Sequence, residues 1–121
     1  MLSIYIEEAH SKDEWYLPEA TTQSGGPIIN AHSSISERIA AAKLFCKNKS
    51  FPEDKIVVDS MKGHITDIYG AWPERLYIIV DGVIIYQGGL GPFEYRLYEV
   101  QEWLANKYGM RGENLRKKQL E

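Results

Sequence analysis

The sequence predicts an α/β fold in which helices flank a mixed β-sheet. Runs of β-forming residues alternate with segments of helical periodicity along the 121 residues, in the order strand, helix, strand, short helix, strand, strand, helix. The Asp81–Gly82 pair is a strong turn signal that joins the last two strands as an antiparallel hairpin. A helix between two strands instead gives a right-handed crossover between parallel strands. The sheet is therefore expected to contain both kinds of pairing.

The first half of the chain contains a strand, a long loop and a capped helix. The strand Leu2–Ile6 is rich in β-forming residues. The loop over residues 11–33 is long for a compact domain, and such loops are usually functional or mobile. Ser34 and Glu37 form a capping box that begins a helix ending near Lys47. The apolar stripe expected on this helix is Ile35, Ile39, Ala42 and Phe45.

Four further elements follow. Lys55–Asp59 is predicted to be a strand, and Gly63–Tyr69 a short helix closed by Gly70. Arg75–Val80 is apolar on both faces, which is typical of a central strand covered by helices. Val83–Gln87 is the second strand of the hairpin.

The C-terminal part is predicted to be a loop, a helix and a tail. Residues 88–92 form the loop, and residues 110–121 are a polar, basic tail outside the domain of residues 1–109. Gly109 is placed to cap the final helix. The stripe expected on that helix is Phe93, Leu97, Val100 and Leu104.

Charge and composition exclude several classes of protein. A net charge of −3 and a pI near 5.6 argue against a nucleic-acid module. The longest strongly apolar stretch, Leu76–Val80, is too short to cross a bilayer, which takes about 20 residues. Cys46 is the single cysteine, which excludes an internal disulfide and a CxxC pair. We expect a soluble, single-domain, cytoplasmic protein, and whether a membrane anchor is encoded upstream stays open.

The order of elements also matches how thioredoxin-like folds end, with a hairpin and a helix. Such folds begin with a strand–helix unit that carries the reactive cysteine at the helix N-terminus, and no such unit precedes Leu2–Ile6. We therefore expect this N-terminal unit to be missing, the Leu2–Ile6 strand to lie inside the sheet, and an apolar gap to be exposed beside it. Such a gap favours aggregation or a homodimer.

Glu8 and His10 are the first candidate catalytic residues. Residues two apart in a strand point to the same side, and this strand ends at the sheet edge where open α/β folds bind ligands. A carboxylate beside an imidazole raises the pKa of the imidazole, which makes His10 an acid suited to neutral pH. The alternative is that His10 is simply solvated at the end of the strand.

His32 and Arg75 are the other candidates. His32 comes just before the Ser34 cap and can reach the same sheet edge, or it only takes part in a local hydrogen bond of its loop. Arg75 enters an apolar strand and there needs an anionic partner. As a fixed cation it would stabilise the anion of a nucleophile, or it only pairs with Glu74 or Asp59.

The remaining reactive residue types have structural interpretations. His64 is expected at the surface, and Cys46 is expected to be a small buried hydrophobic residue near a helix C-terminus. Gly88–Gly91 lacks the GxGxxG spacing and is interpreted as turn residues. No ligand spacing supports a metal site, and no cofactor is expected.

Seven short segments of the chain are specific enough to compare with a known family. They are Tyr5–His10, Pro27–His32, Asp59–Met61, Tyr69–Ala71, Glu74–Tyr77, Tyr86–Gly89 and Gly91–Pro92. Together they resemble the iodothyronine deiodinases, in the right order and over residues 2–108. The resemblance implies a thioredoxin-like fold with peroxiredoxin-like features. It also implies reductive removal of iodide from thyroid hormones by a selenocysteine nucleophile and a thiol reductant.

The resemblance also implies roles for individual residues. Glu8 and His10 match the active-site Glu–His pair of the family, with His10 facing the substrate. His32 matches the second active-site histidine, and Tyr5 a supporting hydrogen-bond donor. Arg75 matches the arginine that clamps substrate in deiodinases and activates the thiolate in peroxiredoxins. Asp59 is a further candidate for a supporting residue of this site.

The chain departs from the family in two ways. This sequence does not contain the segment that bears the selenocysteine, and no cysteine replaces it. The loop between His10 and His32 is longer than in the vertebrate enzymes of the family. The sequence therefore predicts a deiodinase-like oxidoreductase domain that acts on an iodothyronine-type small molecule. The nucleophile would be a selenol or thiol from outside this chain, and a thiol reductant would be the co-substrate. The alternatives are a non-catalytic thioredoxin-like binding module and a fragment of a peroxiredoxin-type thiol peroxidase.

We expect the coding DNA upstream of the Met1 codon to hold the missing unit. Selenocysteine is encoded by UGA, which is commonly interpreted as a stop, so the next in-frame start would become Met1. A strand–helix–strand unit takes roughly 30 residues, which places the nucleophile codon about 20 to 30 codons upstream. Sequencing should find an in-frame UGA or cysteine codon followed by codons for a helix. An unrelated upstream sequence with its own ribosome-binding site would contradict this.

Overall fold

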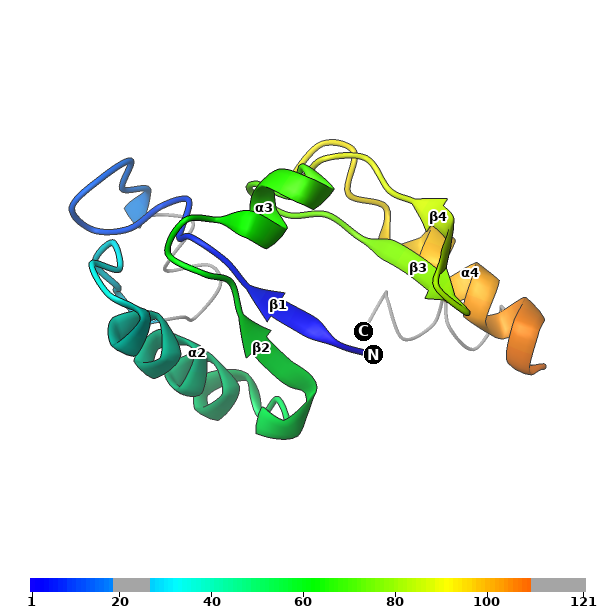
Figure 1. Ribbon diagram of the computed structural model, residues 1–121, viewed down its shortest axis with the longest axis horizontal. Coiled ribbons are helices and arrows are strands. Elements are labelled where there is room, and N and C mark those ends of the chain that lie inside the picture. Colours follow the sequence, from blue (N-terminus) through cyan, green and yellow to red (C-terminus); the bar gives the residue numbers. More distant parts are fainter. Residues whose placement is uncertain (19–26, 110–121) are drawn as a thin grey trace. The chain divides into compact units, whose positions relative to one another are not determined.

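The computed structural model describes residues 1–18 and 27–109 of the chain. The chain divides into two compact units, Met1–Pro73 and Glu74–Glu121, and each unit is described by itself. Both units contain helix and strand, so the predicted α/β class is confirmed (Figure 1). The centre of the predicted long loop and the predicted basic tail at 110–121 lie outside the described residues.

A parallel pair of strands forms the sheet of the first unit. Strand β1 (Ser3–Tyr5) pairs with β2 (Ile56–Val58), and the Asp59 amide donates to the carbonyl of Tyr5 at 2.9 Å just beyond the pair. Between them the chain forms helix α2 (Ile35–Lys49), which lies beside β2, and the 3-10 turn Glu53–Lys55 (Figure 1). The predicted strand–helix–strand order of this unit is therefore confirmed.

The predicted N-cap of α2 is confirmed, with one difference. The Ser34 hydroxyl accepts from the Glu37 amide at 3.2 Å. The Glu37 carboxylate does not return to Ser34 but binds Ser33, whose amide and hydroxyl donate to it at 2.6 and 2.8 Å. The helix ends at Lys49, two residues past the predicted end, where Ser50 adopts a φ of 52° and its amide donates to the Cys46 carbonyl.

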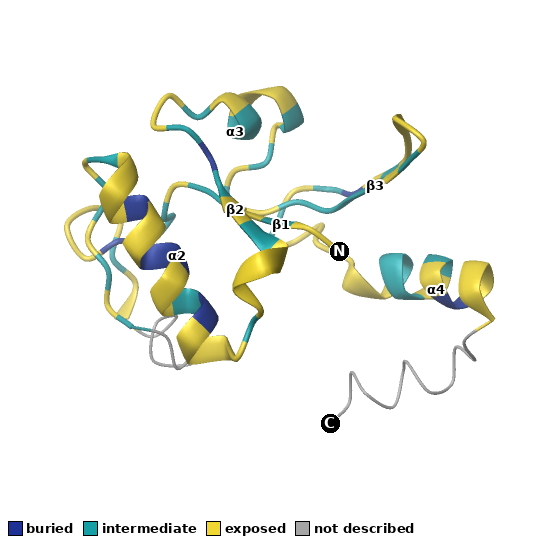
Figure 2. Cartoon of the chain, turned by 60° about the horizontal axis from the view of Figure 1, so that its bottom comes forward, coloured by how far each residue is buried: buried dark blue, intermediate teal, exposed yellow. Residues whose placement is uncertain are grey.

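The buried face of α2 is not the predicted apolar stripe. Ile35 and Ile39 are 42% and 40% exposed. The prediction of these two residues as core was wrong, because the buried face of the helix carries small side chains and one arginine instead. The buried residues, which follow one side of the helix in Figure 2, are Arg38, Ala41, Ala42 and Cys46.

Within the first unit, strand β1 has β2 as its partner strand. The Tyr5 ring packs against the Phe45 ring of α2, with centroids 5.9 Å apart. The paired residues Ile4 and Val57 point to the opposite face, since successive side chains of a strand alternate, and both are exposed. The expected interior position of Leu2–Ile6 stays a prediction, and within the first unit this strand presents an exposed apolar surface.

Helix α3 (His64–Tyr69) completes the first unit and agrees with its prediction. Gly63 precedes it with a φ of 71°, and Gly70 ends it with a φ of 55° and donates to the carbonyls of Thr66 and Asp67. Both glycines adopt the left-handed conformation that other residues rarely adopt, which is why the chain can turn sharply at both ends of so short a helix.

The second unit contains the predicted hairpin. Strand β3 (Tyr77–Val80) pairs antiparallel with β4 (Val83–Gln87), and Asp81 and Gly82 have φ angles of 50° and 77°. Positive φ at both turn residues matches the right-handed twist of the flanking strands. The hairpin forms the sheet of the second unit, and its strand pairing lies within that unit.

Within the second unit by itself, the expected cover of both faces of β3 is not found. Ile79 and its partner Ile84 are each 49% exposed.

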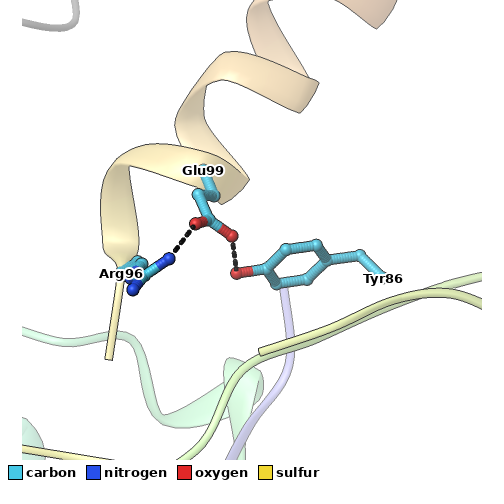
Figure 3. Close-up of polar contacts among 3 residues, drawn as sticks. All are labelled: Tyr86, Arg96 and Glu99. Carbon is cyan, nitrogen blue, oxygen red and sulfur yellow. Dashed lines mark hydrogen bonds and ion pairs between the residues drawn. The ribbon is translucent and has the colours of Figure 1, made fainter. Parts of the chain in front are cut away.

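Helix α4 (Leu97–Tyr108) follows and ends at Gly109, as predicted, with a φ of 71°. It begins four residues after Phe93, which precedes it and is 96% exposed, so Phe93 does not belong to the helix stripe. Figure 3 shows how β4 and α4 are linked: the Tyr86 hydroxyl donates to Glu99 at 2.8 Å, and Arg96 pairs with the same carboxylate at 3.3 Å.

The loop between β4 and α4 is held by backbone contacts. The Gly88 amide donates to the Leu76 carbonyl at 2.8 Å, and the Gly91 amide donates to the Glu74 carbonyl at 3.0 Å. A Cβ atom on Gly91 would overlap the Glu74 side chain, which would have to move to admit any other residue there. The structural interpretation of these glycines is consistent with this packing.

Replacing the α2 cap tests how much it stabilises the first unit. Ser34→Ala removes the acceptor for the Glu37 amide and should lower the free energy of unfolding by about 1 kcal/mol, measured by urea denaturation. Ser36→Ala, at an exposed position in the first turn of the same helix, is the matched control and should change stability by less than half as much. Equal losses in the two variants would contradict the role of the cap.

Candidate functional site

Polar side chains gather at the carboxyl ends of the parallel strands β1 and β2. Tyr5 is the last residue of β1, and its hydroxyl donates a hydrogen bond to the Glu8 carboxylate. Burial, together with the hydrogen bond to Glu8 and its charge, raises the pKa of Tyr5 far above the ordinary value. The phenol therefore stays protonated and fixes one oxygen of Glu8 as a hydrogen-bond acceptor.

Asp59 follows β2 directly and joins that strand to α3. Its side chain is buried, and its two oxygens accept from the amides of Ser60 at 2.8 Å, Ile65 at 3.0 Å and Thr66 at 3.0 Å, and from the Thr66 hydroxyl at 2.7 Å. Burial alone would raise the pKa of Asp59, but these hydrogen bonds outweigh it and lower the pKa. Asp59 is thus an ionised structural anchor for the first turn of α3.

Arg38 is a buried arginine of α2 that connects this strand end to the loop before the helix. It is 4% exposed. Its Nη1 donates to the carbonyls of Asp59 at 3.1 Å and Ser60 at 2.7 Å, and its Nε donates to Nδ1 of His32 at 3.0 Å. One guanidinium therefore fixes the backbone after β2 and the imidazole before α2.

His32 lies half-buried against β1 and α2. Its ring is 5.8 Å from the Tyr5 ring, and its Nε2 is buried without a hydrogen-bond partner among the described residues. Burial, and next the charge of Arg38, lower the pKa of His32, although the carboxylates of nearby glutamates act in the opposite direction. The imidazole is therefore neutral at pH 7.

Glu8 and His10 both lie beyond the end of β1. Strand β1 ends at Tyr5, so the alternation of a strand does not apply to the two residues, and the expectation that they share a strand face was wrong. Nδ1 of His10 lies 3.0 Å from the Trp15 carbonyl, and the two rings meet edge to face at 4.5 Å. The roles assigned to His10 and Glu8 by resemblance stay predictions.

Arg75 belongs to the second unit, where it lies just before β3. Its Nε donates to the Gly88 carbonyl at 2.7 Å, and its guanidinium lies 5.5 Å from the centroid of the Tyr77 ring. These contacts hold the side chain against the hairpin. Its predicted roles in substrate binding and anion stabilisation stay predictions.

Three other expectations concern residues away from these contacts. Cys46 is buried in α2, as predicted, and His64 is exposed. Across residues 1–18 and 27–109, no group of three or more His, Cys, Asp or Glu side chains is placed to hold a metal ion. Within the same ranges, no helix is both long and apolar enough to cross a bilayer.

Sequence reasoning missed Arg38. The signal that could have found it is spacing: Arg38, Ala41, Ala42 and Phe45 follow the three- and four-residue steps of one helix face. An arginine in line with two alanines, whose short side chains let backbones approach, is a candidate for burial against backbone carbonyls. The contact of His10 with Trp15 had no comparable signal, because it depends on the path of a loop.

Comparisons with known proteins match the sequence of this chain to one family. The family model of iodothyronine deiodinase matches residues 1–108. The thyroxine 5-deiodinase of Bos taurus is 45% identical over 103 residues, which are 85% of this chain and 32% of that protein. The proteins of the same name from Homo sapiens and Aquarana catesbeiana are 41% and 40% identical over 103 residues, again 85% of this chain, and 32% and 36% of their own lengths. The chain thus spans about a third of the length of these curated relatives.

The hydrogen bonds of Asp59 should make stability depend on pH in a defined window. The pKa of Asp59 is lower in the folded chain than its unfolded value of about 3.9, so its contribution is fully present above that value and is lost as the pH falls through the folded pKa. Asp59→Asn should lower the free energy of unfolding by about 2 kcal/mol at pH 7. The difference from wild type should narrow below about pH 4.

Urea denaturation at a series of pH values measures this difference. Asp67→Asn, an exposed position on the same helix, is the matched control and should have a much smaller effect. A loss in Asp59→Asn that stays constant down to pH 2 would show that the carboxylate charge is not what stabilises α3.

Proposed function

The chain belongs to the iodothyronine deiodinase family, and we propose that it is the part of a deiodinase-like oxidoreductase that holds an iodothyronine-type substrate and controls protons during reductive deiodination. In this reaction a C–H bond replaces a C–I bond of the substrate, and iodide leaves. Two thiol groups of a reductant supply the electrons and become a disulfide. The attacking selenol or thiol comes from outside this chain, whose single cysteine is buried.

One observation carries the proposal. Within the region that matches the family, Glu8 and His32 each have a buried or half-buried residue that fixes one of their atoms: Tyr5 for the Glu8 carboxylate and Arg38 for the His32 imidazole. Side chains held in this way, next to the carboxyl ends of parallel strands, are typical of a site and not of a solvated surface.

The proposed roles follow from the chemistry of each group. Glu8 and His10 would transfer the proton that is added to the substrate carbon, and His10 would also contact the substrate. His32 would act in the network around the chalcogen nucleophile. Arg75, whose guanidinium is fixed by the Gly88 carbonyl, would stabilise the nucleophile's anion or bind the substrate.

The proposal extends to the fold and to partners. A thioredoxin-like arrangement, with a small-molecule thiol or dithiol protein as reductant, is consistent with the family match and with the strand–helix–strand order. The exposed pair Ile4 and Val57 offers a surface that a second copy of the chain could cover.

A non-catalytic binding module is the second candidate, and one observation favours it. Cys46 is the only cysteine, it is 3% exposed, and it lies in the last turn of α2, so this chain offers no exposed thiol as the nucleophile. The two candidates share substrate binding and differ in whether iodide is released.

A binding and turnover experiment on the 121-residue chain tests the proposal. Thyroxine should bind saturably, as monitored by changes in the amide NMR signals of the chain. Thyronine, which lacks iodine, should bind more weakly. With an added small selenol and a dithiol, the chain should accelerate iodide release above the rate of the selenol alone. His32→Gln should lower this acceleration, whereas His64→Gln, at an exposed histidine, should leave it unchanged.

The outcomes separate the candidates. Binding of thyroxine without any acceleration of iodide release would favour the binding module. Equal signals with thyroxine and thyronine, or no saturable binding of either, would contradict an iodothyronine-type substrate.

A further inference from the structure

The contact between Arg38 and His32 determines which nitrogen of the imidazole carries the proton. An arginine side chain has five N–H donors and no acceptor. Its Nε donates to Nδ1 of His32 at 3.0 Å, so Nδ1 must present its lone pair. A neutral imidazole holds one ring proton, and with Nδ1 as acceptor that proton lies on Nε2.

Arg38 cannot easily turn away from this contact. Its Nη1 is engaged by the carbonyls of Asp59 and Ser60, and the residue is buried on α2. The guanidinium is planar, so once Nη1 is placed against the end of β2, the direction of the Nε–H bond is set as well. The imidazole therefore meets a donor of fixed position and direction.

We propose that Arg38 is a positioning residue that holds His32 in its Nε2–H form, so that His32 enters the reaction as a hydrogen-bond donor through Nε2 and not as a base. This inference deepens the proposed function and rests on it for the reaction in which His32 acts. With the Nδ1 lone pair taken by Arg38 and Nε2 carrying the proton, neutral His32 has no lone pair left to accept a proton. The ligand it suits is an anion or lone-pair acceptor such as a thiolate, a selenolate or a phenolate.

The unpartnered Nε2 supports this assignment. It is buried and has no hydrogen-bond partner in the described part of the chain, which is uncommon for a polar atom in a folded protein. A buried donor of this kind is costly unless an acceptor reaches it. An acceptor on a bound substrate or nucleophile would satisfy it.

The charged groups around His32 allow the neutral form. Tyr5, Glu7 and Glu8 face it from β1 and the following residues, and Glu37 and Arg38 from α2. The three glutamates favour the imidazolium, but burial and the Arg38 charge prevail and lower the pKa of His32. The β2 end contributes carbonyls that bind Arg38, and the Asp59 carboxylate is turned to α3.

Nitrogen-15 NMR of the histidine rings in the 121-residue chain tests the proposal directly. The chain has three histidines, and the His32 signals are assigned by their loss in His32→Gln. At pH 7.5 wild-type His32 should show one form, with a protonated Nε2 and an unprotonated Nδ1. In Arg38→Met the nitrogen shifts should move toward the average of both tautomers, and the titration midpoint of His32 should move to higher pH, because a nearby positive charge is lost.

Two further variants keep the test decisive. Lys43→Met, at an exposed position of α2, removes a charge without touching the imidazole and should leave the His32 spectrum unchanged. Arg38→Lys keeps the charge but lacks the fork that spans the imidazole and two carbonyls, so it should also lose the single tautomer. If Arg38→Met does not fold, the spectra of the wild type and of Arg38→Lys still show whether Arg38 fixes the tautomer of His32.

The results that overturn the proposal are distinct from those that overturn the proposed function. A protonated Nδ1 in wild-type His32, or an unchanged His32 spectrum in both Arg38 variants, would overturn the positioning role. The expected tautomer together with no acceleration of iodide release would support the positioning role and contradict the deiodination reaction.

Discussion

The buried guanidinium of Arg38 is the interaction on which the first unit most depends. Removing a charged group from water costs several kcal/mol unless hydrogen bonds replace its hydration. Here an imidazole nitrogen and two carbonyl oxygens do so, and they come from the loop before α2 and from the end of β2. The buried guanidinium is therefore stabilised only when the helix, the loop and the strand end are all in their native positions.

Asp59 lies at the end of β2 and makes two kinds of contact. Its backbone carbonyl accepts from Arg38, while its carboxylate accepts from the first amides of α3. A cation thus binds carbonyls at the end of a strand, and an anion binds amides at the start of a helix, where each charge meets the backbone groups of opposite polarity. Both ionised side chains therefore bind backbone groups at the turn after β2, one from α2 and the other from the end of the strand.

The second unit is held by contacts of a different kind. Its strands form a local hairpin, its loop is closed by backbone hydrogen bonds to Glu74 and Leu76, and the hydroxyl of Tyr86 ties the hairpin to α4 through Glu99. Arg75 contacts the carbonyl of Gly88 within this unit. The family match spans residues 1–108 and so covers both units, which indicates that both belong to what the family shares.

The sequence by itself determined the elements whose causes are local. The cap at Ser34, the hairpin turn at Asp81 and the helix end at Gly109 depend on one side chain or one φ angle, and all were predictable. The motifs that resemble the deiodinases were equally local, and they led to the family. Only the tertiary structure decided which face of α2 is buried, where His10 lies and that Arg38 belongs to the site. Those outcomes depend on which carbonyls and rings other segments bring near, and no local pattern of residues contains that information.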